Sequence, residues 1–118
     1  MKDFRLLVVD DDPDFAESLA LALGLDGLRV DTVSKGESGV EAARHTAYDA
    51  ILIDIGLPGI NGVETLVRIK EFDPNVRCYL VTGHSADHLF KQGIDAGAIE
   101  VLTKPLDPEV LSRKITAT

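Results

Sequence analysis

Five polar side chains each come directly after a short apolar run, although the runs lie far apart in the chain. They are Asp10 and Asp11 after residues 6–9, Asp54 after residues 50–53, Thr82 after residues 78–81 and Lys104 after residues 101–103. In an open parallel sheet, ligands bind beyond the carboxyl ends of the strands. If the apolar runs are such strands, these side chains converge on one edge of the sheet.

The chemistry of these residue types points to a phosphoryl group. Two like charges about 4 Å apart repel by roughly 4 kcal/mol at an effective dielectric near 20, so three clustered carboxylates need a cation. Mg²⁺ prefers oxygen ligands and keeps positions for phosphate oxygens. A carboxylate can also act as a nucleophile and form an aspartyl phosphate. The Lys104 ammonium, the Thr82 hydroxyl and backbone N–H groups of residues 56–59 could then neutralise the phosphoryl oxygens, which is most of what phosphoryl transfer requires.

The elements that would position these residues are visible as five strand-like runs. They cover residues 5–9, 29–33, 50–55, 77–81 and 100–102. The segments 6–9, 50–53 and 78–81 are continuously apolar, which is typical of strands buried on both faces.

Amphipathic stretches between these runs predict five helices. Phe15, Leu19 and Leu23 recur at helical spacing, with Gly24 as a stop. The other patterns are Val40, Ala43 and Ala47; Val63, Leu66, Ile69 and Phe72, ended by Asp73-Pro74; Leu89, Phe90 and Ile94, ended by Gly97; and Asp107 as an N-cap before Pro108. We expect Leu89, Phe90 and Ile94 to be core residues. The alternation predicts a parallel sheet covered on both faces.

Composition narrows the class of protein. The length of 118 residues predicts one domain over residues 1–118. The net charge of -8 disfavours direct contact with the phosphate backbone of nucleic acid. Cys78 is the only cysteine, so no internal disulfide can form. No signal peptide is visible, and no apolar stretch approaches the roughly 20 residues that span a bilayer. We expect a cytoplasmic protein without membrane contact. The short last helix fits a piece cut from a longer protein.

Five sequence motifs together identify a family. They are residues 7–13 (LVVDDDP), 54–64 (DIGLPGINGVE), 81–84 (VTGH), 96–98 (AGA) and 102–105 (LTKP). In this order and spacing, the chain resembles the receiver domain of bacterial two-component response regulators over essentially its whole length. The resemblance implies a doubly wound, flavodoxin-like (βα)5 fold of three layers, with a five-stranded parallel sheet in the order 2-1-3-4-5.

The resemblance also implies a role for each matching residue. Asp54 would accept the phosphoryl group and would also be a ligand of Mg²⁺. Asp11 would bind the ion directly, and Asp10 would assist in holding it. The backbone carbonyl of Gly56 would be a further metal ligand.

The remaining residues of the motifs would bind the phosphoryl group. Thr82 would swing toward it and Lys104 would pair with it, and Pro105 would follow a cis peptide bond. A sensor histidine kinase or a phosphotransfer protein would be the donor. The signal would pass to an output domain or partner through the face built from the fourth helix, the fifth strand and the fifth helix. Such a module is a switch and not a turnover enzyme. Dimerisation on phosphorylation is common in the family, and no residue here commits the chain to it.

Three positions depart from the family pattern or vary within it. Val101 stands where the family usually has an aromatic residue that moves with the hydroxyl residue, so a switch based on a ring is absent here. Gly56 and His84 follow Asp54 and Thr82 at positions linked to phosphoryl lifetime, which the sequence does not predict.

Parts of the same pattern also fit other interpretations. The acidic run from Asp10 to Asp12 could cap a helix, since Asp is favoured there. Asp10-x-Asp12 formally matches an aspartyl-phosphate phosphohydrolase, although the chain lacks room for a substrate-selecting cap. A dinucleotide-binding fold fails because no glycine-rich turn follows the first strand. A receiver-like module that takes no phosphate remains an alternative. We interpret His84 and His88 as surface histidines and Cys78 as inert packing.

Overall fold

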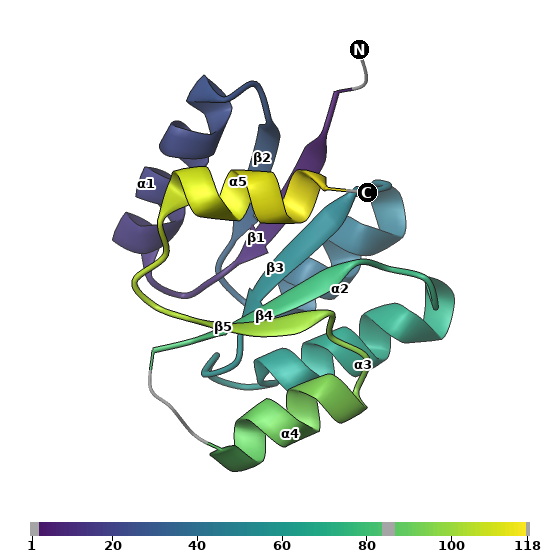
Figure 1. The fold of residues 1–118 in the computed structure, drawn as a ribbon. Helices are drawn as coiled ribbons and strands as arrows, with labels where there is room; N and C mark the ends of the chain where they lie inside the picture. Colours follow the sequence, from purple (N-terminus) through teal and green to yellow (C-terminus); the bar gives the residue numbers. More distant parts are fainter. Residues whose placement is uncertain (1–2, 84–86, 118) are drawn as a thin grey trace.

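The computed structural model describes residues 3–83 and 87–117 and shows five strands that alternate with five helices (Figure 1). The elements are β1 (Arg5–Val9), α1 (Pro13–Leu25), β2 (Arg29–Val33), α2 (Gly36–His45), β3 (Ala50–Asp54), α3 (Gly62–Phe72), β4 (Cys78–Thr82), α4 (Asp87–Asp95), β5 (Glu100–Thr103) and α5 (Pro108–Thr116). All strand pairs are parallel, and the sheet order is β2-β1-β3-β4-β5. This is the doubly wound three-layer fold that the sequence predicts.

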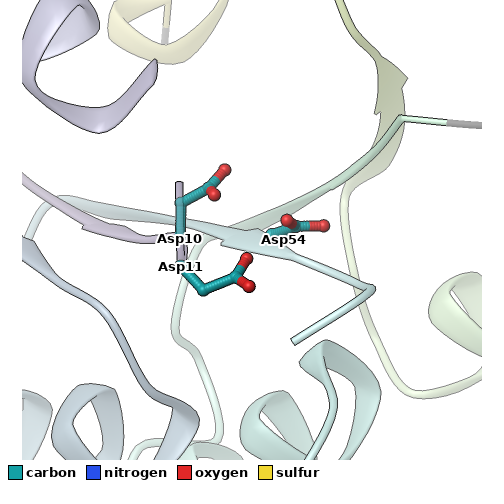
Figure 2. Close-up of side chains that lie close together, drawn as sticks. All are labelled: Asp10, Asp11 and Asp54. Atoms are coloured by element: carbon teal, nitrogen blue, oxygen red, sulfur yellow. The ribbon is translucent and has the colours of Figure 1, made fainter. Parts of the chain in front are cut away.

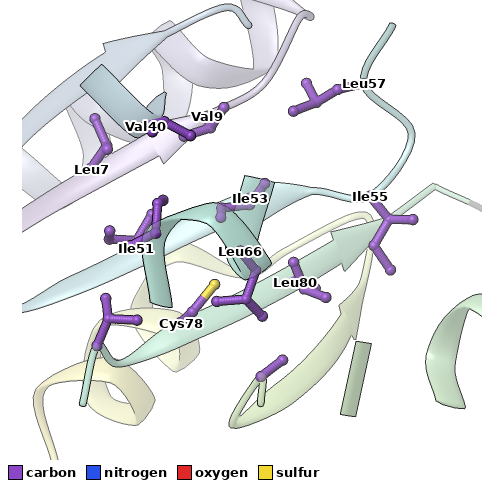
Figure 3. Packing of buried hydrophobic residues seen from close by; sticks show 13 residues of the cluster. Leu7, Val9, Val40, Ile51, Ile53, Ile55, Leu57, Leu66, Cys78 and Leu80 are labelled. Atoms are coloured by element: carbon purple, nitrogen blue, oxygen red, sulfur yellow. The ribbon is translucent and has the colours of Figure 1, made fainter. Parts of the chain in front are cut away.

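The central strands are buried on both faces because their side chains alternate between two apolar clusters. On one face, Leu7, Ile53 and Leu80 pack with Val40 of α2 and Leu66 of α3 (Figure 3). On the opposite face, a second cluster joins β1, β3 and β4 to α1 and α5; it includes Leu6, Leu52, Val81, Leu19 and Ile115. Helices α1 and α5 cover one face of the sheet, and α2, α3 and α4 cover the other (Figure 1). Side chains on both faces of the central strands are therefore buried, which is why the apolar runs are continuous.

The observed strand bounds agree with the predicted runs to within one residue, but two helix ends differ. The predicted stop at Gly24 is wrong, because α1 continues to Leu25 and Asp26 is its C-cap. The chain turns instead at Gly27, whose φ of 89° is a conformation that favours glycine. Helix α2 ends at His45, so Ala47 lies beyond it.

The expected core face of α4 is also wrong in part. Phe90 is 52% exposed and Ile94 is 39% exposed, whereas Leu89 packs against the core. Gly93 of α4 is buried close to the sheet, since a Cβ placed there would lie 2.6 Å from Leu80 Cδ1 and 3.2 Å from Val101 Cγ2. The side of α4 that carries Leu89 and Gly93 therefore faces the sheet, and Phe90 and Ile94 lie outside it.

Among the described residues, no helix combines the length and the apolar composition that crossing a membrane requires.

Candidate functional site

Three carboxylates meet at the ends of β1 and β3, which are neighbours in the sheet (Figure 2). Asp10 follows β1 and is buried, Asp11 is exposed, and Asp54 is the partly buried last residue of β3. One carboxylate oxygen from each residue lies within 4.8 Å of the others. Parallel pairing of β1 with β3 produces this convergence, because both strands end at the same edge of the sheet.

Lys104 reaches this group from the far side of β4. Its N–H donates to the carbonyl of Thr82 at 2.9 Å, which joins the ends of β5 and β4. Its Nζ lies 2.9 Å from Asp10 Oδ2 and 3.6 Å from Asp54 Oδ2. The peptide bond between Lys104 and Pro105 is cis, as the resemblance implied. The ammonium therefore bridges the buried acid and the acid at the end of β3.

The environment of Asp54 opposes its ionisation. Burial raises the pKa of this carboxyl above its ordinary value, and the charges of Asp10 and Asp11 raise it further. The N–H of Gly56, which donates to Asp54 Oδ1 at 3.0 Å, and the Lys104 ammonium act in the opposite direction but do not cancel the effect. The net direction is upward, which fits a site with too little positive charge.

The environment of Lys104 favours its charged form. Burial alone would lower the pKa of the ammonium. The hydrogen bond to Asp10 and the charges of Asp54, Asp10 and Asp12 outweigh burial, so the pKa lies above its ordinary value. Among the described residues, one ammonium faces three carboxylates, so the cluster has a formal excess of two negative charges when all three acids are ionised. A set of carboxylate oxygens with excess negative charge suits a hard divalent cation such as Mg²⁺.

Asp12 belongs to helix α1 and not to the carboxylate group. Its Oδ1 accepts from the N–H groups of Asp14 at 3.1 Å and Phe15 at 3.2 Å, which makes it the N-cap of α1. Its own N–H donates to Asp10 Oδ1 at 2.9 Å. The capping interpretation of the acidic run is thus correct for Asp12. A phosphohydrolase that uses Asp10-x-Asp12 would need the Asp12 carboxyl as a proton donor, whereas its Oδ1 here accepts two hydrogen bonds at the start of α1.

The end of β3 is held in place by a close approach of helix α3. A Cβ on Gly62 would lie 2.4 Å from the carbonyl oxygen of Asp54 and 2.7 Å from Ile55 Cα, so only glycine fits. The N–H of Gly62 donates to the carbonyl of Ile55 at 3.0 Å. The sequence motif at residues 54–64 includes Gly62 but does not reveal this contact. The Asn61-Gly62 pair before an apolar helix pattern was the available signal.

The other predicted site residues lie as follows. Thr82 is the partly buried last residue of β4, and Gly56 is exposed just after β3. Val101 of β5 is partly buried opposite Leu80. His84 and the side chain of His88 lie outside the described part of the structure, so their interpretation as surface histidines stays a prediction.

One contact of the site was not expected from the sequence. The Nζ of Lys104 lies 4.1 Å from the centroid of the Phe15 ring. In the sequence, Phe15 is part of an apolar helical pattern with Leu19 and Leu23, and nothing in that pattern points to a lysine almost ninety positions away.

Comparisons with known proteins agree with this geometry. The family model described as response regulator receiver domain matches residues 6–116. The chain is 36% identical over 113 residues to the transcriptional regulatory protein TcrA of Mycobacterium tuberculosis; the match covers 96% of this chain and 45% of TcrA. It therefore spans about half the length of that relative.

Two solved structures share the fold over nearly the whole chain. A CheY-like response regulator receiver domain protein from Methanospirillum hungatei superimposes with a TM-score of 0.92 at 28% identity, covering 97% of this chain and 91% of that one. The BeF3-activated receiver domain of DrrB superimposes with a TM-score of 0.85 at 31% identity, covering 97% of this chain and 95% of that one.

Proposed function

The chain belongs to the receiver domain family of two-component response regulators, which act in phosphorylation-based signalling, and from this premise we propose that Asp54 is its phosphoryl acceptor. The observation that carries the proposal is the convergence of Asp54 with Asp10, Asp11 and Lys104 from the ends of three strands. No other described group of three or more acidic, histidine or cysteine side chains is arranged to hold a cation.

The proposed transfer makes one bond and breaks one. A carboxylate oxygen of Asp54 attacks phosphorus, and the bond between phosphorus and the imidazole nitrogen of a donor phosphohistidine breaks. The imidazole leaves and takes up a proton from water. Lys104, 3.6 Å from Asp54, would neutralise charge on the transferred group, and Thr82 would approach it with its hydroxyl. Attack of water on the phosphoryl group later restores Asp54. The protein is thus a switch and not a turnover enzyme.

The carboxylates fit a magnesium ion. Asp10, Asp11 and Asp54 would hold it, with the carbonyl of Gly56 as a further ligand, and the hard oxygen donors match its preference. When bound, Mg²⁺ supplies positive charge that stabilises the oxygens of the phosphoryl group. The formal excess of negative charge in the ionised cluster supports this assignment.

The proposed output surface is the face formed by α4, β5 and α5. Phe90 and Ile94 on α4 and Val110 on α5 are exposed apolar side chains of these elements. Val101 carries no ring that could swing between two positions. We therefore propose that the charge change reaches this face through β5 itself, whose end is joined to β4 by the bond from Lys104 to Thr82.

The proposed partners and location follow from this role. A sensor histidine kinase or a phosphotransfer protein would supply the phosphoryl group, and an output domain or a partner protein would bind the output surface. A cytoplasmic location and dimerisation on phosphorylation stay predictions. TcrA is named a transcriptional regulator, which makes a DNA-binding output domain in a longer protein one candidate; the receiver itself, with its net charge of -8, would not contact DNA.

Intact-mass measurement tests the proposal. The protein is incubated with Mg²⁺ and a small phosphodonor, beside Asp54→Asn and Asp26→Asn variants. Asp26 is an exposed acid at the C-cap of α1 and is the matched control. We expect one added phosphoryl group in the wild type and in D26N, and none in D54N or without Mg²⁺. An adduct that persists in D54N would refute Asp54 as the acceptor. Wild-type protein that binds Mg²⁺ but takes no phosphoryl group, even from a histidine kinase, would favour the phosphate-independent module.

A further inference from the structure

The Lys104 ammonium has a third neighbour besides its two carboxylates. Its Nζ lies 4.1 Å from the centroid of the Phe15 ring, 2.9 Å from Asp10 Oδ2 and 3.6 Å from Asp54 Oδ2. A cation within about 6 Å of an aromatic centroid is attracted by the electron density of the ring face. The contact is therefore attractive, and the function proposed above does not use it.

The backbone of Phe15 is connected to the site residue Asp10 through Asp12, the N-cap of α1. Asp10 Oδ1 accepts from the N–H of Asp12, and Asp12 Oδ1 accepts from the N–H of Phe15. The Phe15 ring packs partly against the apolar cluster between the sheet and α1 and α5, and its face meets Lys104. The contacts close a ring from Asp10 through Asp12, Phe15 and Lys104 back to Asp10.

This ring of contacts restricts a flexible side chain. Lysine has a four-carbon stem and a compact charge, and ordering it has an entropic cost. The attraction of the carboxylates for the Lys104 ammonium changes when Asp54 is phosphorylated, because the negative charge of Asp54 moves onto the phosphoryl oxygens. The attraction of the Phe15 ring is unaffected by that change.

We propose that Phe15 is a positioning residue for the phosphoryl-transfer reaction: its ring holds the Lys104 ammonium beside Asp54. The proposal rests on the function proposed above. It assigns to the first turn of α1 a part in arranging a lysine that β5 supplies. Phe15 acts through Lys104 and does not touch the phosphoryl group itself.

The test compares Phe15→Leu with Phe15→Tyr. Leucine keeps an apolar side chain and removes the π face, whereas tyrosine keeps the face. With a small phosphodonor below saturation and with Mg²⁺, we expect F15L to be phosphorylated roughly three- to tenfold more slowly, which lies within the range that a partly buried cation–π contact implies. F15Y should stay within about twofold of wild type on the same basis.

A second measurement requires no phosphodonor. Protons on the Lys104 ε-carbon should show an upfield ring-current shift by NMR in the wild type and F15Y, and the shift should vanish in F15L. If F15L does not fold, a ring-fluorinated phenylalanine at position 15 replaces it, because fluorination keeps the ring shape and weakens the attraction of its face. The fluorinated protein should show the same slower phosphorylation.

Phe72 offers a matched control, since Arg44 Cζ lies 4.6 Å from its ring centroid on the other face of the sheet. Phe72→Leu removes a contact of the same kind and should leave the phosphorylation rate unchanged. An F15L rate equal to or above wild type, or an equal slowing in F72L, would overturn the inference while leaving Asp54 as acceptor. A wild-type protein that is never phosphorylated would overturn both proposals, and a missing ring-current shift in phosphorylatable wild type would overturn this one alone.

Discussion

At the scale of single residues, the site is organised around a carboxylate that is costly to ionise. Asp54 is partly buried beside Asp10 and Asp11, and the ammonium of Lys104 lies closer to Asp10 than to Asp54. A nucleophile needs its ionised form, so the electrostatics of the metal-free site oppose the proposed reaction. An added divalent cation would reverse that balance. The reaction and the stability of the fold therefore place opposite demands on Asp54.

This conflict predicts that Asp54→Asn stabilises the metal-free protein at pH 7. The pKa of Asp54 in the fold lies above the value near 3.9 of an unfolded chain, so the unfolded chain loses this proton first as pH rises. Stability from the neutral carboxyl is thus complete below about pH 3.9 and is lost as pH rises through the folded-state pKa. Asparagine stays neutral and can still accept from Gly56.

Urea unfolding with a metal chelator tests this prediction. The denaturant midpoint of D54N should exceed that of wild type at pH 7, and the gap should narrow as the buffer is acidified. D26N, which changes an exposed acid, controls for the loss of one negative charge. A gap that widens on acidification would mean that the pKa of Asp54 is shifted in the opposite direction.

At the scale of elements, glycine positions decide how closely α3 approaches the site. Gly62 lets the start of α3 contact the backbone of Asp54 and Ile55. Gly24 lies inside α1, and a Cβ added there would have nothing within 4 Å. The two residues are chemically identical, so the same substitution isolates the effect of their surroundings.

We expect opposite results from Gly24→Ala and Gly62→Ala. Alanine at position 24, the second-last residue of α1, should stabilise the protein by about 0.4–1 kcal/mol, because it restricts the unfolded chain and fits the helical backbone. Alanine at position 62 should destabilise it by about 1–3 kcal/mol because its Cβ overlaps backbone atoms that can hardly move. It should also slow phosphorylation by displacing Asp54. Urea unfolding gives both signs, and two changes of equal sign would contradict the contacts described for α3.

The same elements show what the sequence could predict and what it could not. Continuous apolar runs predicted β1, β3 and β4 to within one residue, and parallel pairing then predicted that Asp10, Asp54 and Lys104 converge. Helix ends and faces were harder. Gly24 resembled a stop because glycine is common there, but a glycine is tolerated inside α1 and Gly27 makes the turn.

Two further misses have the same physical origin, which is that contacts across the fold leave no local pattern. The inner side of α4 is marked by Gly93, which carries no hydrophobic signal, so the larger Phe90 was expected in the core. Phe15 follows the helical apolar pattern whether or not Lys104 lies against its ring.

At the scale of the whole molecule, the acidic cluster exists only when the sheet is formed. Its members come from the ends of β1 and β3, with Lys104 from the end of β5, and the two apolar clusters on either side of the sheet hold those strands in register. An unfolded chain brings Asp10 and Asp11 together but not Asp54. A divalent cation that needs all three carboxylates therefore binds the folded state selectively.

Selective binding predicts that Mg²⁺ raises the melting temperature. A ligand bound only by the folded state stabilises it by about 2.7 kcal/mol at one hundred times its dissociation constant. Thermal melts across a Mg²⁺ series should therefore rise steadily for wild type and for D26N, and much less for D54N. Because the net charge is -8, part of any rise could come from general screening, so monovalent salt of equal ionic strength is the reference. Equal rises in D54N and wild type above that reference would show that the ion binds without Asp54, and the proposed coupling of metal to acceptor would fail.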